Sequence, residues 1–203
     1  MLLKEIYPNY DYDIQVTGIA TDSRFVKPGN LFLPLNGNNF SGNEFCIEAI
    51  TKGACAIISC EMISNLTVPV IIVDDIQNEL MRILDLIYQK PYNKLTLIGV
   101  TGTDGKTSVS TLTNYLLNHI SSCANIGTNG ITYGNHVIDN LFTTPLLTEN
   151  YRLLNEFANN NIAYVSMEVS SQGIANNRIK GILYDYAVFT NLSHEHLDTH
   201  KTM

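Results

Sequence analysis

The chain has 203 residues, of which 45% are hydrophobic, so it is long enough and apolar enough to bury a core. Its formal net charge is −7 and it contains no run of lysine or arginine, which excludes a broad electrostatic footprint for nucleic acid. No window reaches the length of a membrane span, and the amino terminus lacks the apolar core of a signal peptide. We therefore expect a cytoplasmic, monomeric protein without a nucleic-acid or membrane partner.

The first part of the chain is typical of a small α/β domain. Its pattern predicts strands at residues 13–24, 30–37, 54–59 and 68–75, and helices at 43–53 and 77–90. The segment 88–96 then breaks the pattern with proline, asparagine and two lysines. We place a domain boundary in it, which gives domains of residues 1–92 and 93–203.

The second part alternates strands and helices. It predicts a strand, a glycine loop and a helix at 95–119, a strand at 123–128, a hairpin at 131–139, a helix at 148–159, and strands at 162–169 and 184–192. This order predicts a mostly parallel, doubly wound sheet, so the fold class is α/β. The four cysteines form no CxxC pair and no cluster with histidine, so we interpret them as small buried hydrophobes without disulfides.

The glycine loop, TGTDGKTS at residues 101–108, has the composition of a phosphate-binding loop. Gly102 and Gly105 let backbone N–H groups turn toward an anion, and the helix that follows adds the positive end of its dipole. Lys106 would reach the outer phosphates, and Thr107 would offer its hydroxyl to Mg²⁺. The strict P-loop pattern fails because Val100 stands where its first glycine belongs, but GxxGK[ST] remains.

Two carboxylates, one inside this loop and one at the end of a later strand, need an interpretation of their own. Asp104 lies inside the loop, where a carboxylate would repel phosphates, so we expect it to face outward. Glu168 ends a predicted parallel strand, at the edge where open α/β sheets bind ligands. Its neighbours are apolar, so it either needs a cation or is a strand-end carboxylate exposed to water.

The segment at 194–200 gathers histidines and carboxylates, namely His194, Glu195, His196, Asp198 and His200. Its HxHxxxH spacing is compatible with zinc, but the strand or helix geometry that zinc sites use is not evident. A second interpretation is that the segment is a solvated polar loop after a strand. A third is that one of its histidines helps to hold Mg²⁺ at the nucleotide. The residues alone leave these three interpretations open.

Five stretches, in order along the chain, together resemble the Mur ligases, the ATP-dependent amide-bond ligases of peptidoglycan precursor synthesis. They are TDSRFVKPGNLFLPLNG, GVTGTDGKTS, TTP, MEVSSQG and FTNLSHEHLDTHKTM. TGTxGKT combined with TTP and EVSS resembles the MurE type, whereas MurF-type relatives usually carry serine in the loop. Folylpolyglutamate synthetases share the loop but lack the first stretch.

The resemblance implies an activity. A MurE-type ligase would use ATP and Mg²⁺ to convert the free carboxylate of UDP-MurNAc-L-Ala-D-Glu into an acyl phosphate. The amine of L-lysine or meso-diaminopimelate would then attack it. The implied partners are therefore the UDP-MurNAc-peptide and the amino acid.

The resemblance also assigns residues. It implies ATP binding by Gly102, Thr103, Asp104, Gly105, Lys106, Thr107 and Ser108. It implies Mg²⁺ binding by Thr107, Glu168 and His196, so that Lys106, Glu168 and His196 serve catalysis. It implies substrate contacts by Thr21, Ser23, Asn38, Asn39 and Phe40 near the uridine, and by Thr143, Thr144, Ser170, Asn176 and Arg178 elsewhere on the UDP-muramoyl-peptide.

The sequence departs from the family in four respects. Asp104 replaces a usual asparagine, Phe142 precedes TTP where a polar residue can occur, and Asn176 replaces a frequent glutamine. Family members also continue to a carbamylated lysine and a third domain, so the resemblance implies an amino-terminal portion that is inactive alone and lacks the carboxyl-terminal ligase domain. The alternatives are a non-catalytic nucleotide and UDP-sugar-binding module, a MurF-like ligase, and a generic P-loop NTPase switch.

Overall fold

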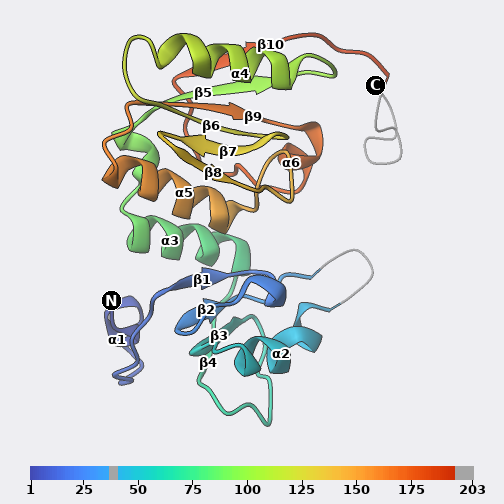
Figure 1. The fold of residues 1–203 in the computed structure, drawn as a ribbon. Helices are drawn as coiled ribbons and strands as arrows, with labels where there is room; N and C mark the ends of the chain where they lie inside the picture. The colour runs from blue at the N-terminus through green and yellow to red at the C-terminus, as the bar shows by residue number, and fades with distance from the viewer. Residues whose placement is uncertain (37–40, 195–203) are drawn as a thin grey trace. The chain divides into compact units, whose positions relative to one another are not determined.

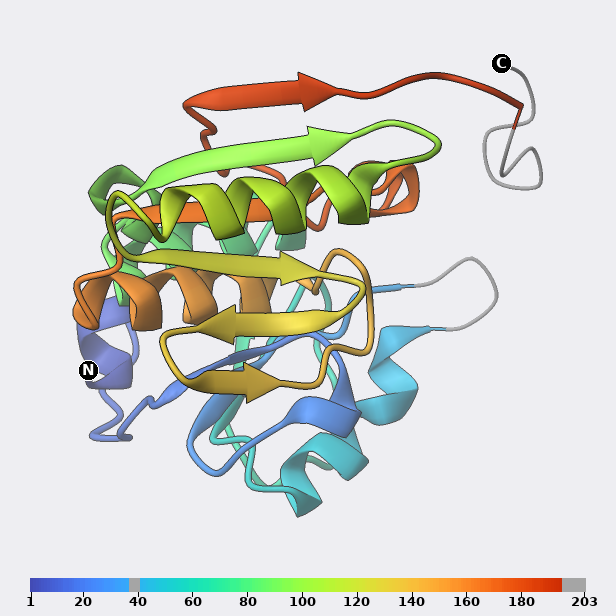
Figure 2. The same cartoon turned by 45° about the horizontal axis from the view of Figure 1, so that its top comes forward.

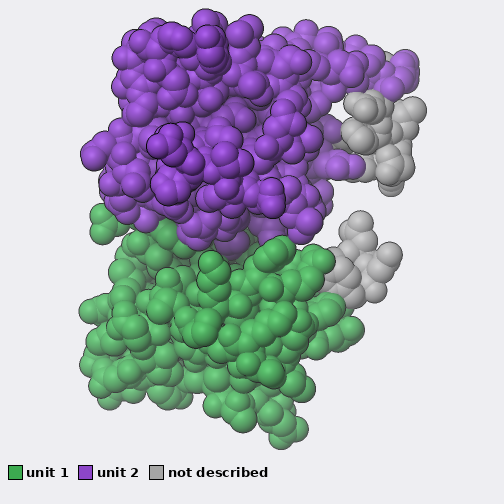
Figure 3. Space-filling view, viewed as in Figure 1, with its two compact units in different colours: residues 1–89 green, residues 90–203 purple. Residues whose placement is uncertain are grey.

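The computed structural model describes residues 1–36 and 41–194, which form two compact units that divide between Gln89 and Lys90 (Figure 3). The division lies three residues before the boundary expected from the sequence. The reason is that the 3₁₀ helix η3 (Pro91–Lys94) packs with the second unit, where the Tyr92 ring meets the Tyr151 ring edge-on at 5.9 Å.

The first unit is a four-stranded, fully parallel sheet whose strands follow each other in chain order (Figure 1). Its elements are α1 (Leu3–Ile6), β1 (Gly18–Ala20), η1 (Ser23–Phe25), β2 (Asn30–Phe32), η2 (Gly42–Phe45), α2 (Cys46–Thr51), β3 (Ala56–Ser59), β4 (Val70–Ile72) and α3 (Ile76–Tyr88). The four strands are shorter than the sequence predicts. The short helix α1 was not predicted.

Apolar side chains from β1, β2, β3 and α2 form one core in this unit. Ala20, Phe32, Cys46, Ala49 and Ile57 are among its buried members. The strands β1, β2 and β3 are buried at every position. This burial explains their mostly apolar sequences, because a parallel sheet is covered on both faces. The four cysteines of the chain are free, but only Cys46 and Cys123 are buried. Cys55 is half-buried and Cys60 is exposed, so the interpretation as buried hydrophobes is wrong for these two.

The amino terminus of α3 is capped by Asp75, whose Oδ1 accepts hydrogen bonds from the N–H groups of Gln77 (2.8 Å) and Asn78 (3.0 Å). The Asp75→Ala variant is expected to lower the free energy of unfolding by about 1 kcal/mol, because these N–H groups have no intrahelical partner. Urea unfolding measures this loss. The matched control is Asp74→Ala, one residue before the cap, and an equal loss in both variants would contradict the capping role.

The second unit contains a six-stranded sheet in the order β10-β5-β9-β6-β7-β8. Its elements are β5 (Thr96–Thr101), α4 (Lys106–Leu117), β6 (Cys123–Gly127), β7 (Gly130–Tyr133), β8 (His136–Ile138), α5 (Leu147–Asn159), β9 (Tyr164–Glu168), α6 (Ser171–Ala175) and β10 (Tyr186–Phe189). The strands β10, β5, β9 and β6 are parallel, and the expected hairpin adds β7 and β8 antiparallel. The α/β fold class with a mostly parallel second sheet is confirmed.

The helices α4 and α5 cover opposite faces of this sheet (Figures 1 and 2). The α4 face of β9 is polar, and Ser166 donates a hydrogen bond to the carbonyl of Ser110 in α4 at 3.0 Å. The other face is apolar, with Val165 and Met167 buried. Among the described residues, no helix is long and apolar enough to cross a membrane.

The carboxyl ends of the four parallel strands meet at one edge of the sheet. Thr101 at the end of β5 pairs with Phe189 of β10, and Val100 pairs with Glu168 of β9. The β6 strand ends beside β9 at Gly127. This shared edge brings four sequence-distant segments together, and it is where ligands bind in open α/β sheets.

Candidate functional site

The glycine loop joins the end of β5 to the start of α4, as its sequence predicts. Gly102 has a φ of +135° and Gly105 a φ of +83°, conformations that glycine adopts most readily. Gly105 is the N-cap residue of α4, so the first-turn N–H groups of the helix face the loop. Asp104 is exposed to solvent.

The ammonium group of Lys106 turns back onto this loop. Its Nζ donates hydrogen bonds of 2.7 Å to the carbonyl oxygens of Gly102 and of Thr103. Lys106 is therefore held beside the loop as its cation. An oxyanion bound by the first turn of α4 would meet both this charge and the positive end of the helix dipole.

Glu168 is buried beside the same helix. Its exposed fraction is only 1%, so the interpretation as a water-exposed carboxylate is wrong. Its Oε2 accepts a hydrogen bond from the Thr107 hydroxyl at 2.8 Å, which brings together two of the residues predicted to bind Mg²⁺. Within the described part of the chain, Glu168 forms no ion pair.

Two residues at the end of β6 complete the surroundings of Glu168, and sequence reasoning missed both. The Thr128 N–H donates to Glu168 Oε1 at 2.9 Å, and the Thr128 hydroxyl donates to Oε2 at 3.2 Å. The Thr128 hydroxyl also lies 3.0 Å from that of Thr143. Gly127 leaves the space that the carboxylate fills. Both residues lie at the end of a predicted parallel strand, and this position could have identified them as candidate site residues.

Adding a methyl group at Gly127 is expected to displace Glu168, because a Cβ there would lie 2.1 Å from Glu168 Oε1 and 2.8 Å from its Cδ. We expect the Gly127→Ala variant to lower the free energy of unfolding by about 1–3 kcal/mol. Urea unfolding of a double-mutant cycle with Glu168→Ala tests the cause. The Gly127→Ala cost should fall sharply once the carboxylate is removed, and an unchanged cost would contradict this contact.

The Thr-Thr-Pro segment contacts the loop that follows β9. Thr144 is buried, and its hydroxyl donates to the Glu168 carbonyl at 2.9 Å and lies 3.1 Å from the Ser170 hydroxyl. Ser170 in turn accepts from the Gly173 N–H at 3.0 Å and caps α6, a helix where the sequence predicted only a polar loop. Two predicted substrate residues, Thr144 and Ser170, thus lie in one hydrogen-bonded group.

Arg178 lies against the same Thr-Thr-Pro segment. Its Nη1 donates to the Thr144 carbonyl at 3.0 Å, and its guanidinium carbon lies 4.2 Å from the centroid of the Phe142 ring. Burial lowers the pKa of Arg178. Phe142, which departs from the family, therefore supports the guanidinium by a cation–π contact. Asn176, another predicted substrate residue, is exposed, and its side chain donates to the Gln172 carbonyl at 2.8 Å.

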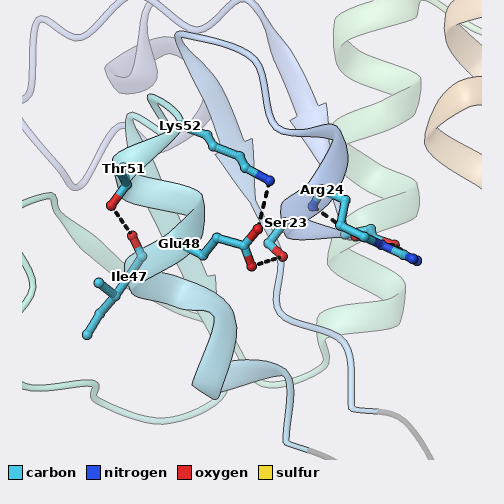
Figure 4. Close-up of polar contacts among 7 residues, drawn as sticks. Ser23, Arg24, Ile47, Glu48, Thr51 and Lys52 are labelled. Carbon is cyan, nitrogen blue, oxygen red and sulfur yellow. Dashed lines mark hydrogen bonds and ion pairs between the residues drawn. The ribbon is translucent and has the colours of Figure 1, made fainter.

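In the first unit, Ser23 is buried in η1, and Thr21 is half-buried just before it. The Ser23 hydroxyl donates to Glu48 Oε2 at 2.8 Å, and Lys52 donates to Glu48 Oε1 at 2.7 Å (Figure 4). Arg24 forms an ion pair of 2.6 Å with Asp22 in the same segment. The hydroxyl of the predicted substrate residue Ser23 is thus oriented by α2, which sequence reasoning did not find.

Several predicted site residues lie outside the described residues: His196 of the metal site, and Asn38, Asn39 and Phe40 of the substrate site. His194 is described and exposed. In residues 1–36 and 41–194, no group of three or more histidine, cysteine, aspartate or glutamate side chains is placed to hold a metal ion. Glu168 and Thr107 nevertheless fit Mg²⁺, which prefers oxygen ligands and retains several of its waters.

The sequence matches two families. The family described as the Mur ligase middle domain matches residues 100–203, and the Mur ligase family catalytic domain matches residues 15–87. A UDP-N-acetylmuramoyl-L-alanyl-D-glutamate–2,6-diaminopimelate ligase of Gloeobacter violaceus is 38% identical over 94% of this chain and 40% of its own length. A UDP-N-acetylmuramyl-tripeptide synthetase 2 of Oceanobacillus iheyensis is 39% identical over 93% of this chain and 39% of its own length.

Solved structures agree with these matches. A structure of a UDP-N-acetylmuramoyl-L-alanyl-D-glutamate–2,6-diaminopimelate ligase aligns with a TM-score of 0.72 at 27% identity, over 97% of this chain and 41% of that one. A MurF ligase of Thermotoga maritima, solved in complex with ADP, shares the fold with a TM-score of 0.55 at 24% identity, over 94% of this chain and 41% of that one. The chain spans about 40% of the length of the curated relatives named above. The middle-domain match alone covers more than half of the chain, which therefore belongs to the Mur ligase family.

Proposed function

We propose that this chain supplies the nucleotide site and the UDP-muramoyl-peptide site of a MurE-type ligase. The ligase would use ATP and Mg²⁺ to add a diamino acid, L-lysine or meso-diaminopimelate, to UDP-MurNAc-L-Ala-D-Glu in the cytoplasm. The observation that carries the proposal is the 2.8 Å hydrogen bond between Thr107 and buried Glu168. It joins the glycine-loop helix to a strand-end carboxylate that has no cationic partner within the described residues.

The nucleotide part of the proposal rests on the positive groups that surround the glycine loop. Lys106 and the first-turn N–H groups of α4 would bind the phosphates, and they would offset the repulsion between ATP and an incoming carboxylate. Glu168 and Thr107, with His196, would hold Mg²⁺. When bound, Mg²⁺ would neutralise charge on the phosphates as the acyl phosphate forms.

The peptide part rests on the group around Thr144. Thr143 and Ser170 are half-buried and carry hydroxyls at the carboxyl edge of the sheet, whereas Thr144 is buried and orients Ser170. Arg178 adds a planar fork suited to a carboxylate or a phosphate. These residues would orient the free carboxylate of the substrate toward ATP. In the first unit, Thr21 and Ser23 would contact the uridine end. The role of the chain residues in this mechanism is to bind, orient and stabilise charge.

Isothermal titration calorimetry with Mg-ATP and with UDP-MurNAc-L-Ala-D-Glu tests the proposal. We expect both to bind. The Ser170→Ala variant should weaken binding of the UDP-muramoyl-peptide about ten-fold by removing a hydroxyl from the site, while the matched control Ser121→Ala, at an exposed serine, should not. Failure of both ligands to bind would overturn the proposal, and binding of ATP alone would favour a P-loop NTPase switch.

A second assay separates binding from chemistry. The chain is mixed with Mg-ATP, UDP-MurNAc-L-Ala-D-Glu and hydroxylamine, which converts an acyl phosphate into a hydroxamate. Hydroxamate would show that the described sites activate the carboxylate. Binding of both ligands without hydroxamate would instead favour the alternative of a nucleotide and UDP-sugar-binding module for this chain.

A further inference from the structure

The segment that follows β10, residues 190–193, contacts the first half of the glycine loop. The Thr190 hydroxyl donates to the Asp104 carbonyl at 2.7 Å, with the Thr101 carbonyl as a second acceptor at 3.2 Å. The Asn191 side chain contacts both polar groups of the Asp104 backbone, because its Nδ2 donates to the carbonyl at 3.1 Å and its Oδ1 accepts from the N–H at 2.9 Å. We call Thr190 and Asn191 the loop brace.

A third loop residue is bound to the same segment. The Thr103 N–H donates to the Asn191 carbonyl at 3.0 Å, and the Ser193 N–H donates to the Thr103 hydroxyl at 2.9 Å. β5 and β10 are adjacent parallel strands that end at the same edge, so the loop after one and the segment after the other run side by side (Figure 2). Both loop residues between the two glycines are therefore held by residues nearly ninety positions later in the chain.

The close approach explains why Gly102 is glycine. A Cβ at Gly102 would lie 2.1 Å from the Thr190 hydroxyl oxygen and 2.9 Å from the Asn191 carbonyl oxygen. The sequence alone explained this glycine by an anion at the loop. The structure gives it a second role, because only glycine leaves room for the brace.

The brace also decides which N–H groups are left for an anion. Those of Thr103 and Asp104 are directed at Asn191. Those of Lys106, Thr107 and Ser108 lie in the first turn of α4, where helix geometry provides no intrahelical partner. The brace thus holds the loop in the shape that presents the start of α4 and Lys106 on one side.

We propose that Thr190 and Asn191 are positioning residues for nucleotide binding: they fix the Asp104 peptide and keep the loop in its binding-competent shape. This inference rests on the proposed function. Asn191 is exposed and Thr190 is half-buried, so their hydrogen bonds contribute little to the stability of the whole chain. Their loss acts instead through the fraction of molecules whose loop is ready to bind, which lowers the apparent affinity by the same factor.

Calorimetric titration of the chain with Mg-ATP tests the brace. We expect Asn191→Ala and Thr190→Val each to weaken binding about ten-fold, the effect of losing one or two hydrogen bonds that order the loop. Thr190→Ser keeps the donor and should bind like the unmodified chain. The matched control is Thr111→Val, the same change at an exposed position of α4. The melting temperatures of all variants should stay close to that of the unmodified chain.

Amide hydrogen exchange without nucleotide gives an independent measurement. Asn191→Ala should speed exchange at the N–H groups of Thr103 and Asp104 while leaving the β5 strand protected. Unchanged Mg-ATP affinity in Asn191→Ala and Thr190→Val would overturn the positioning role. So would an affinity loss in Thr190→Ser equal to that in Thr190→Val, or a loss explained by a large fall in melting temperature.

The nucleotide part of the proposed function and the positioning role can fail separately. If the unmodified chain does not bind Mg-ATP, the nucleotide part of the proposed function is overturned, and the positioning role is overturned with it. Faster exchange at Thr103 and Asp104 in Asn191→Ala would then show a brace with a purely structural role. If the unmodified chain binds Mg-ATP and the brace variants bind equally well, only the positioning role is overturned.

Discussion

Replacing Glu168 by glutamine is expected to leave the chain folded and to remove most of the stabilisation that Mg-ATP gives it. A bound ligand at one hundred times its Kd stabilises a protein by about 2.7 kcal/mol, and we expect the unmodified chain to gain this amount. Glu168→Gln should lose most of it, because a neutral amide binds Mg²⁺ weakly. Thermal unfolding with and without Mg-ATP measures the difference.

The same variant should be at least as stable as the unmodified chain when Mg²⁺ and ATP are both absent. Glu168 is a carboxylate with 1% exposure and no ion pair within the described residues, so its burial costs free energy. The amide of glutamine fits the same surroundings, since its oxygen can accept from the Thr128 N–H and its NH₂ can donate to the Thr107 hydroxyl.

The matched control is Glu44→Gln, the same change at an exposed glutamate, which should alter neither stability nor the effect of Mg-ATP. A Glu168→Gln variant that is stabilised by Mg-ATP as strongly as the unmodified chain would contradict the metal role of Glu168. A large loss of stability in the absence of ligand would instead show that the carboxylate is needed for the fold.

The fold class was predictable because it depends on local patterns. Apolar runs that alternate with amphipathic segments predicted a small α/β domain and then a mostly parallel sheet, and the glycine loop predicted the junction of β5 and α4. The helix α6 escaped prediction because five residues are too few for a periodic apolar face, and its start depends on the cap by Ser170. Side-chain capping of this kind has only a weak signature in a single sequence.

The candidate site was predictable only in part, because its geometry is built by residues that are distant in the chain. The sequence placed Glu168 at a strand end, but it could not show burial, which depends on Gly127 at the end of β6 and on Thr128 just after it. It likewise identified the glycine loop but not the loop brace, which lies nearly ninety residues later. Hydrogen bonds over such separations follow from the strand order, which single-sequence patterns do not give.

Replacing Lys106 by alanine is expected to weaken Mg-ATP binding about a hundred-fold, which corresponds to about 2.7 kcal/mol, the range of charge-assisted hydrogen bonds. Calorimetry measures the change. Without ligand, the variant also loses the hydrogen bonds from Nζ to the Gly102 and Thr103 carbonyls. Because Lys106 is only half-buried, water screens these contacts, and the free energy of unfolding should fall by only about 1 kcal/mol. Binding should therefore be lost far more strongly than stability.

Two variants show whether this loss belongs to the charge at this position. Lys94→Ala removes an exposed lysine of the same unit and should leave Mg-ATP binding unchanged, which excludes an effect of net charge alone. Lys106→Arg keeps the charge but replaces a compact ammonium group by a planar fork, so it should restore only part of the affinity. If Lys106→Ala binds Mg-ATP as tightly as the unmodified chain, the loop is not the phosphate site. In that case the contacts of Lys106 with the two carbonyls serve the fold of the loop alone.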